Sequence, residues 1–209
     1  DFLRNVGGAA AASALSASAI PSVHAAGSDT LEVALIGCGG RGTGAAEDAL
    51  ATQAKHGTIR LTAMADYLPG KVERSYKQLK DKNPSLVDVP KERQFSGLNA
   101  FKQAMDSLKP GNIAIFATPP AFRWVFFKYA IEKGLNVFLE KPVTVDGPTS
   151  KRMLELSKEA DAKNLKVGVG LMVRHCRGRQ ELEKRIRDGE IGDIISMRAY
   201  RMHGPVGYA

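Results

Sequence analysis

The chain has 209 residues, of which 44% are hydrophobic and 25% are charged, so it can bury the core of one full domain and is neither disordered nor fibrous. No run of about 18 apolar residues comes after the N-terminal segment, which excludes a multi-span membrane protein. The 30 basic and 22 acidic side chains give a net charge of +8, but the bases mostly stand beside acids and are not interleaved with aromatic residues, so we expect no nucleic-acid partner.

Residues 1–26 have the composition of an export signal. They are rich in Ala and Ser and end in the small-x-small pattern Val23-His24-Ala25. The opening Asp-Phe-Leu-Arg resembles the segment directly after the arginine pair of a twin-arginine signal, although the pair itself is absent. We therefore expect an incomplete signal of a periplasmic or exported protein without a stable membrane anchor. The alternatives are a cytoplasmic protein and a frayed Ala-rich helix.

From Thr30 onward, apolar strand patterns alternate with helical patterns. The strands are expected at 31–36, 59–65, around Phe95, and at 112–117, 136–139 and 166–171. The helices between them are expected at 43–55, from Pro69 onward, and at 98–108, 122–133 and 148–163. This alternation predicts an α/β Rossmann fold with a doubly wound parallel sheet.

The pattern changes towards the C-terminus. After a helix expected at 179–187, residues 193–202 alternate between apolar and polar side chains like a half-exposed strand. We therefore predict an export signal at 1–26, a dinucleotide-binding domain at 30–175, and the start of a truncated α+β C-terminal domain at 176–209.

A glycine-rich turn comes after the first strand and opens the first helix. It comprises Gly37, Cys38, Gly39, Gly40, Arg41 and Gly42. Glycines at these spacings permit a tight turn, close approach of the backbone to a pyrophosphate, and close packing of helix on strand. The helix N-terminus favours an anion, and Arg41 could add a guanidinium contact. Dinucleotide binding is the favoured interpretation, and a purely structural turn is the alternative.

The acidic residue at the end of the second predicted strand is Asp66. From this position a carboxylate can accept hydrogen bonds from the adenosine ribose hydroxyls, and it would repel a 2′-phosphate. The sequence therefore favours NAD over NADP as the cofactor. The alternative is an acid that caps the helix beginning near Pro69.

Two cysteines, Cys38 and Cys176, cannot form a disulfide framework, and neither belongs to a pair with metal-ligand spacing, so no metal site is predicted. His175 precedes Cys176, but neighbours in sequence rarely share a geometry useful for catalysis. We expect two free thiols without a catalytic role.

Three further motifs complete a resemblance. The fourth strand ends in Ala117-Thr118-Pro119-Pro120, the fifth ends in Glu140-Lys141-Pro142, and a Val-Gly-Val-Gly strand comes next. With the glycine turn, these motifs resemble the glucose-fructose oxidoreductase/inositol dehydrogenase (Gfo/Idh/MocA) family. The resemblance implies that Ala117, Thr118, Pro119 and Pro120 cover the cofactor. It also implies that Glu140 contacts the cofactor ribose or nicotinamide and that Lys141 is the catalytic residue beside the nicotinamide.

The position of Lys141 supports the same role, because the carboxyl ends of parallel strands form the crevice where open α/β sheets bind ligands. A lysine there can polarise or deprotonate a hydroxyl, and a plain surface lysine is the alternative. Arg174 and His175 end the sixth predicted strand at the same edge. They are candidates for substrate binding and, equally, for positioning the next helix.

The predicted function is NAD-dependent hydride transfer at a hydroxyl of a sugar, cyclitol or related polyol. The alternatives are a glycoside hydrolase that oxidises its sugar transiently with bound NAD, and a non-enzymatic dinucleotide-dependent protein. The resemblance also implies a second domain with an Asp and a His for proton transfer and substrate positioning, and these lie beyond this sequence. We therefore expect no turnover from the 209-residue chain alone. Separately, we expect a homo-oligomer when the protein is full length.

Overall fold

The computed structural model describes residues 30–53, 57–200 and 202. The predicted export signal at 1–26 lies outside the described residues. The chain divides into two compact units, and the division falls between Gly170 and Leu171.

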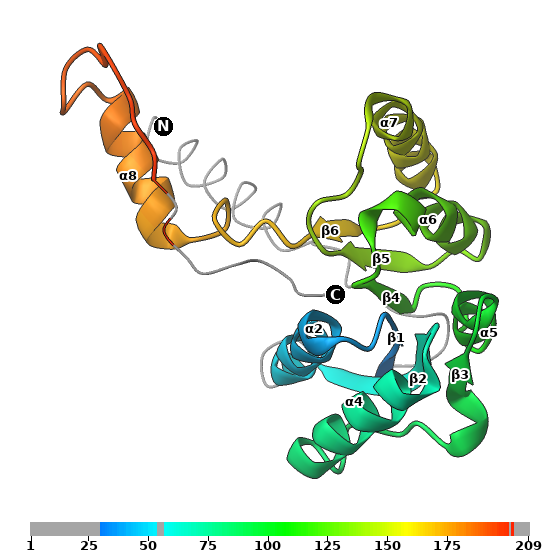
Figure 1. The fold of residues 1–209 in the computed structure, drawn as a ribbon. Coiled ribbons are helices and arrows are strands. Elements are labelled where there is room, and N and C mark those ends of the chain that lie inside the picture. Colours follow the sequence, from blue (N-terminus) through cyan, green and yellow to red (C-terminus); the bar gives the residue numbers. More distant parts are fainter. Residues whose placement is uncertain (1–29, 54–56, 201, 203–209) are drawn as a thin grey trace, which may run out of the picture. The chain divides into compact units, whose positions relative to one another are not determined.

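The first unit is built on a six-stranded sheet (Figure 1). Its strands are β1 (Thr30–Ile36), β2 (Thr58–Asp66), β3 (Gln94–Ser96), β4 (Ile113–Phe116), β5 (Asn136–Leu139) and β6 (Val167–Val169). They lie in the order β3-β2-β1-β4-β5-β6, and every neighbouring pair is parallel. From β1 to β3 each new strand is added on one side of β1, and from β4 to β6 each is added on the other side. The strand order therefore changes direction between β1 and β4, and doubly wound sheets bind ligands at this point.

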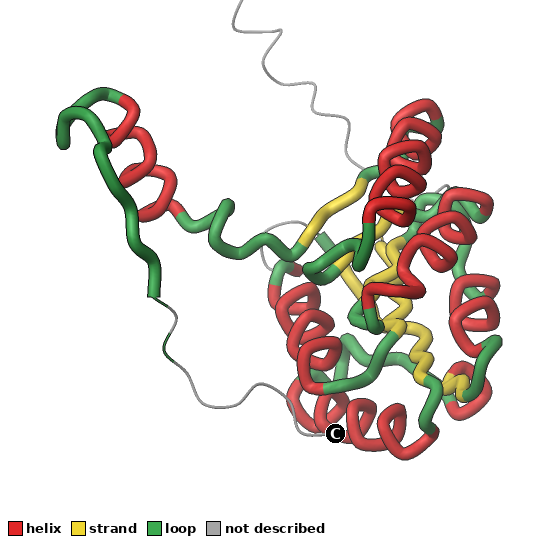
Figure 2. Tube along the Cα trace, turned by 45° about the horizontal axis from the view of Figure 1, so that its top comes forward, coloured by secondary structure: helices red, strands yellow, loops and turns green. Residues whose placement is uncertain are grey.

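Helices cover both faces of this sheet (Figure 2). One face packs against α2 (Gly40–Ala51) and α4 (Pro69–Lys82). The other packs against α5 (Ala100–Asp106), α6 (Arg123–Glu132) and α7 (Gly147–Ala162). Two short 3-10 helices, η1 (Lys91–Arg93) and η2 (Pro120–Phe122), lie in the connections.

The strand β1 shows why this fold requires continuous apolar runs. Val33 and Leu35 belong to the core under α2 and α4, whereas Ala34 and Ile36 belong to the core under α5, α6 and α7. Successive side chains of a strand point to opposite faces, and both faces are covered here, so no polar alternation appears. The predicted Rossmann fold is confirmed.

Element ends differ from expectation by a few residues. Helix α2 begins at Gly40, inside the glycine turn, rather than at Thr43. Glycine is a poor helix former, so propensity alone placed the start too late. Strand β6 covers only 167–169 of the expected 166–171, where it lies at the edge of the sheet and has one neighbour, β5.

The second unit corrects one prediction. It contains α8 (Arg177–Arg187), which buries no residue, but residues 193–200 and 202 form no strand. Ile195 and Met197 are 97% and 83% exposed. A strand is held by ladder hydrogen bonds to a neighbour, and no described segment pairs with this one. The described part of the unit therefore holds one helix and no strand, and the start of a C-terminal domain at 176–209 stays a prediction.

Candidate functional site

The glycine turn after β1 is shaped by two close approaches. Gly37 has φ +98°, its N–H donates to the carbonyl of Ala65 over 2.8 Å, and an added Cβ would lie 2.7 Å from the carbonyl of Ala117. At Gly42 an added Cβ would lie 1.8 Å from the carbonyl oxygen of Gly37. Only glycine permits this conformation and these contacts, so the turn is built to bring α2 against the end of β1.

Gly39 and Gly40 have open space around them. An added Cβ at either residue would meet no atom within 4 Å. Gly39 is the N-cap of α2, no side chain caps this helix end, and its first turn holds no acidic residue. The first N–H groups of a helix have no partner within the helix and carry its positive dipole end. This end of α2 therefore fits a phosphate group.

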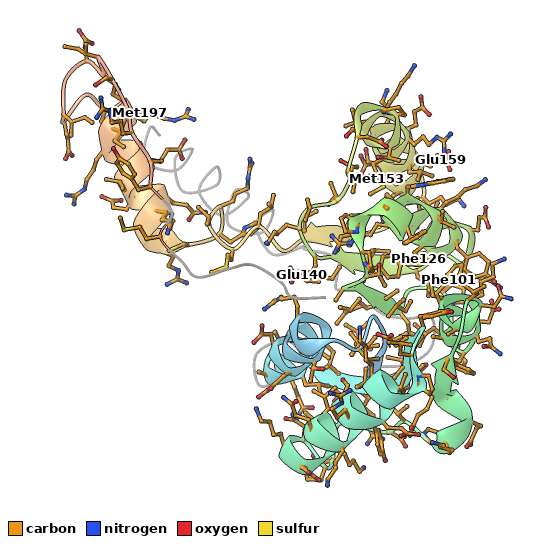
Figure 3. The ribbon with its side chains drawn as sticks, viewed as in Figure 1. Phe101, Phe126, Glu140, Met153, Glu159 and Met197 are labelled. Carbon is orange, nitrogen blue, oxygen red and sulfur yellow. The ribbon has the colours of Figure 1, made fainter. Side chains whose placement is uncertain are left out.

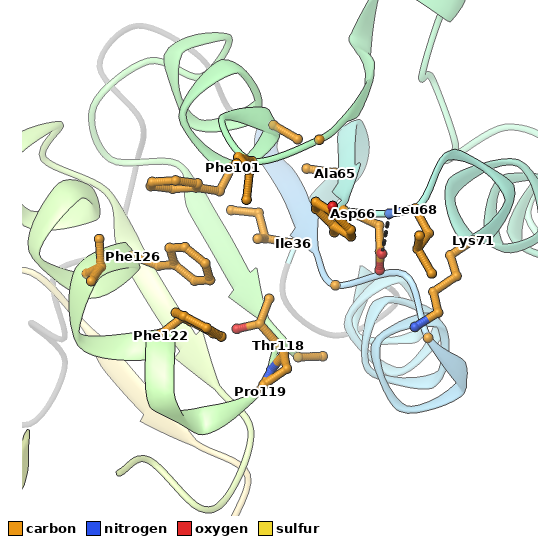
Figure 4. Close-up of a pocket in the computed structure, with 18 residues that line it drawn as sticks. Ile36, Ala65, Asp66, Leu68, Lys71, Phe101, Thr118, Pro119, Phe122 and Phe126 are labelled. Carbon is orange, nitrogen blue, oxygen red and sulfur yellow. Dashed lines mark hydrogen bonds between the residues drawn. The ribbon is translucent and has the colours of Figure 1, made fainter. Parts of the chain in front are cut away.

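Asp66, the last residue of β2, is oriented by the backbone on both sides. Its Oδ2 accepts from the N–H of Cys38 over 2.8 Å. Its Oδ1 accepts from the N–H of Leu68 over 3.0 Å, a bond drawn in Figure 4. The N-cap of α4 is Leu68, whose own side chain makes no capping bond, and Asp66 holds the backbone N–H of this residue. Asp66 thus ties the glycine turn to the start of α4 and presents a carboxylate beside the turn.

Cys38 is turned inward from the same loop. Its thiol donates to the carbonyl of Ala65 over 3.4 Å, and the residue is 4% exposed. Burial, together with the charge of Asp66, raises the pKa of the Cys38 thiol to about 12. The backbone N–H of Cys38 is bound to Asp66, so Cys38 helps to hold the turn in place. The other cysteine, Cys176, is exposed in the second unit.

A cavity of about 590 Å³ opens beside Asp66 and the glycine turn, at the carboxyl ends of β1, β2 and β4 (Figure 4). Its apolar wall comes from Phe101 of α5, Phe122 of η2 and Phe126 of α6. The rings of Phe101 and Phe126 lie side by side, with centroids 4.4 Å apart (Figure 3). The size and the mixture of aromatic and acidic lining fit a nucleoside.

Thr118 adds a polar group to this wall. Its hydroxyl oxygen is buried and has no hydrogen-bond partner in the described part of the chain. A buried hydroxyl without a partner is costly, so its position suits a ligand that can bond to it. The neighbouring Pro119 lines the cavity too, whereas Pro120 begins η2.

The end of β5 places a buried acid next to an exposed lysine. Glu140 is 4% exposed, and its N–H donates to the carbonyl of Phe116 over 2.9 Å. Its Oε1 accepts from Nε of Arg41 over 2.8 Å, so Arg41 joins α2 to the end of β5. Gly170, which ends the Val-Gly-Val-Gly motif, leaves room for this carboxylate, because a Cβ there would lie 2.9 Å from Oε1. Lys141 is the next residue after Glu140 and is exposed at the same edge of the sheet.

Sequence reasoning missed three parts of this site. Arg123 is buried and binds the loops after β4 and β5, Lys71 of α4 lines the cavity, and the three phenylalanines form its wall. The only local signal was for Arg123, a charged residue within the apolar run Phe-Arg-Trp-Val-Phe-Phe. A charge in such a run needs a buried partner, which the sequence does not name.

Arg174 and His175 lie in the second unit, where both are exposed. The carbonyl of Arg174 accepts from the side chain of Gln180 in α8 over 2.9 Å. Their contact with a substrate stays a prediction. In the described ranges no three His, Cys or acidic side chains gather as metal ligands would, and no helix there is long and apolar enough to cross a membrane.

Comparisons with known proteins agree with this geometry. The chain is 29% identical over 113 residues to inositol 2-dehydrogenase of Corynebacterium glutamicum strain R, in an alignment that covers 53% of this chain and 33% of that enzyme. Inositol 2-dehydrogenase of Leifsonia xyli is 29% identical over 104 residues, or 49% of this chain and 30% of that enzyme. The chain thus spans about a third of the length of these curated relatives.

Solved structures share the fold. Myo-inositol 2-dehydrogenase from Lactobacillus plantarum superposes with a TM-score of 0.59 at 23% identity, covering 79% of this chain and 43% of that one. Scyllo-inositol dehydrogenase from Lactobacillus casei, with bound NAD(H) and scyllo-inositol, gives 0.57 at 20% identity, covering 78% and 43%.

A family model also matches most of the first unit. Residues 31–171 fit the oxidoreductase family with an NAD-binding Rossmann fold. The chain therefore belongs to the Gfo/Idh/MocA oxidoreductase family and carries its NAD-binding Rossmann fold.

Proposed function

We propose that this chain binds NAD at the carboxyl edge of its sheet and serves hydride transfer between NAD and a hydroxyl of a sugar, cyclitol or related polyol. The observation that carries the proposal is the cavity of about 590 Å³ bounded by the glycine turn and Asp66. An uncapped helix N-terminus and a fixed carboxylate at one opening suit the pyrophosphate and the ribose of a dinucleotide.

In this proposal, residues near β1 and β2 bind the adenosine half of NAD, and residues at the end of β5 serve the nicotinamide half and the substrate. The start of α2, at Gly39 and Gly40, would hold the pyrophosphate, and Asp66 would accept hydrogen bonds from the adenosine ribose. Glu140 and Lys141 lie at the end of β5 for the other half of the cofactor and the substrate. Bound NAD supplies the hydride acceptor. Lys141 would hold the reacting hydroxyl and take up its proton.

The substrate class rests on the relatives. The curated proteins that match this chain are inositol 2-dehydrogenases, and one structural neighbour holds NAD(H) and scyllo-inositol. These similarities support a cyclitol or sugar hydroxyl as the reacting group without selecting one compound.

Two measurements test the proposal. Titration of the chain with NAD and NADP should show binding, with NAD the tighter ligand. The whole protein should then reduce NAD with at least one of a panel of inositols and sugars, monitored by absorbance of the reduced cofactor. Absence of NAD binding would reject the proposal. Release of the aglycone from an aryl glycoside, without net reduction of NAD, would support the glycoside hydrolase instead.

We also propose that the protein is exported and forms homo-oligomers. Export is supported by the Ala/Ser-rich pattern of residues 1–26 and its small-x-small ending. Cell fractionation of the tagged protein tests the location, and light scattering on the purified protein tests the oligomeric state. Recovery of only cytoplasmic protein, or of only monomers, would contradict the respective proposal.

A further inference from the structure

Arg123, the first residue of α6, links the two loops that come after β4 and β5. Its Nε and one terminal nitrogen donate to the carbonyl of Thr118 over 3.0 and 2.6 Å. Its other terminal nitrogen donates to the carbonyl of Pro142. One planar guanidinium therefore binds the loop of the Thr-Pro-Pro motif and the loop of the Glu-Lys-Pro motif at the same time.

The charge of Arg123 lies inside the protein, with 4% of the residue exposed. Burial lowers the pKa of the guanidinium, and the negative charge of Glu140 offsets part of that effect. Glu140 is itself 4% exposed and accepts from Arg41. A buried arginine is kept only where its donors are used, and here three of its nitrogens are bound to carbonyls beside the candidate site.

Lys141 stands between two anchored neighbours. Glu140 before it is held by the carbonyl of Phe116 and by Arg41, and Pro142 after it is held by Arg123. The Lys141 side chain remains exposed at the edge of the sheet. The backbone on both sides of this exposed lysine is therefore attached to the rest of the first unit.

We propose that Arg123 is a positioning residue, which fixes Lys141 for its work on the substrate by joining the carbonyls of Thr118 and Pro142. This inference rests on the proposed function, because it takes Lys141 as the residue that handles the substrate hydroxyl. It predicts that Lys141 is held in place only when both loops are hydrogen-bonded to one side chain. A positive charge near Glu140 should not be enough to hold it.

The variants Arg123→Lys and Arg123→Met separate the bridge from the charge. Lysine keeps the positive charge, but its single ammonium group cannot donate to both loops as the planar guanidinium does. Methionine removes both the charge and the hydrogen bonds to the loops. Arg152→Met is the matched control. Arg152 is exposed on α7 and stacks on Trp124, next to Arg123, with its guanidinium carbon 4.6 Å from the ring centroid. Thermal melting first identifies the variants that fold. If Arg123→Met does not fold, the test is made with Arg123→Lys alone.

The first readout is amide hydrogen exchange of the full ligand-free chain, measured by mass spectrometry. Peptides covering 117–122 and 139–144 should exchange at least about ten-fold faster in the Arg123 variants, and at the original rate in Arg152→Met. Peptides from β1 and β2 should not change. Unchanged exchange in Arg123→Lys would overturn the bridge, because the charge alone would then be sufficient.

The second readout is the split between turnover and cofactor affinity in the whole protein. Both Arg123 variants should lower kcat at least about ten-fold while the Kd for NAD changes less than about three-fold. Added guanidinium ion should restore part of the turnover of Arg123→Met. Full turnover in Arg123→Lys would reject the proposal. Failure of the original chain to bind NAD would reject the proposed function instead, since the exchange experiment contains no NAD.

Discussion

The two halves of the candidate site achieve their shape in opposite ways. At the ends of β1 and β2, the shape depends on missing side chains, since Gly37 and Gly42 allow contacts that a Cβ would prevent. At the ends of β4 and β5, it depends on long side chains from elsewhere in the fold, since Arg41 reaches Glu140 and Arg123 reaches two loops. Cofactor phosphates need close access to the backbone, whereas a reacting group needs a side chain held in one place.

Each half is therefore vulnerable to a different kind of substitution. Adding one methyl group at Gly37 or Gly42 should damage the glycine half, because the backbone at these two positions leaves no space for a Cβ. Removing one functional group should damage the β4–β5 half, because the side chains of Arg41 and Arg123 bind its loops. Substitutions in both halves test that contrast.

Lys141→Ala should cause the largest change, and it should appear only in turnover. Because Lys141 is exposed, the fold should remain. Because the proposed pyrophosphate site is the glycine turn, the Kd for NAD should stay within a few-fold. Loss of a proton-transferring group should lower kcat by about 10²- to 10⁴-fold. Kinetics and NAD titration on one preparation measure both. Lys109→Ala, an exposed lysine before β4, is the control. Lost NAD affinity with preserved turnover would reverse the assigned roles.

Gly42→Ala and Gly44→Ala place the same methyl group two residues apart in α2. At Gly42 the new Cβ would lie 1.8 Å from the carbonyl oxygen of Gly37, whereas at Gly44 its nearest neighbour would be the flexible Arg41 side chain at 3.9 Å. We expect Gly42→Ala to lower the free energy of unfolding by about 3 kcal/mol and to weaken NAD binding. Gly44→Ala should raise the free energy of unfolding by up to about 1 kcal/mol. Denaturant unfolding measures both, and equal effects would contradict the close contact at Gly42.

Asp66→Asn should change the choice of cofactor. We expect the original chain to bind NAD more tightly than NADP by about 1 to 3 kcal/mol, because the carboxylate accepts ribose hydroxyls and repels a 2′-phosphate. The neutral side chain of Asp66→Asn should reduce the difference in binding free energy between NAD and NADP to below about 1 kcal/mol. One reason is that Lys71, which lines the cavity, can then attract the 2′-phosphate without an opposing carboxylate. Asp81→Asn, an exposed acid of α4, controls for net charge. Equal affinities of the original chain for NAD and NADP would refute the role of Asp66.

The cysteines should give the smallest functional effect. Because burial raises the pKa of the Cys38 thiol to about 12, only about 10⁻⁴ of it is thiolate at pH 8. Iodoacetamide at pH 8 should therefore label the exposed Cys176 and leave Cys38 unmodified, without loss of NAD binding. Peptide mass spectrometry reads the labelling, and urea-unfolded protein should label at both positions. Rapid native labelling of Cys38 would show that the turn opens.

Local patterns were sufficient for the first half of the site. The glycine turn, Asp66 at the end of β2 and the alternation of strands with helices were all predicted from the sequence. Each depends on residues within a few positions of one another or on a strand end, where backbone conformation is set by residue type. The strand expected at 193–202 is absent from the described residues there. An alternating pattern forms a strand only where a neighbouring strand pairs with it, and local sequence does not determine whether such a neighbour is present.

The sequence by itself determined the parallel α/β fold, the glycine turn after β1 and the acid beside it, because local conformational rules are enough to specify these features. Only the tertiary structure decided that Arg41 pairs with Glu140, that Arg123 joins the two loops beside Lys141, and that three phenylalanines from three elements wall one cavity. Arg41 and Glu140 are separated by 99 residues along the chain. Such contacts depend on how the strands are ordered in the sheet, and a side chain's partner is then chosen by distance in space rather than by position in the sequence.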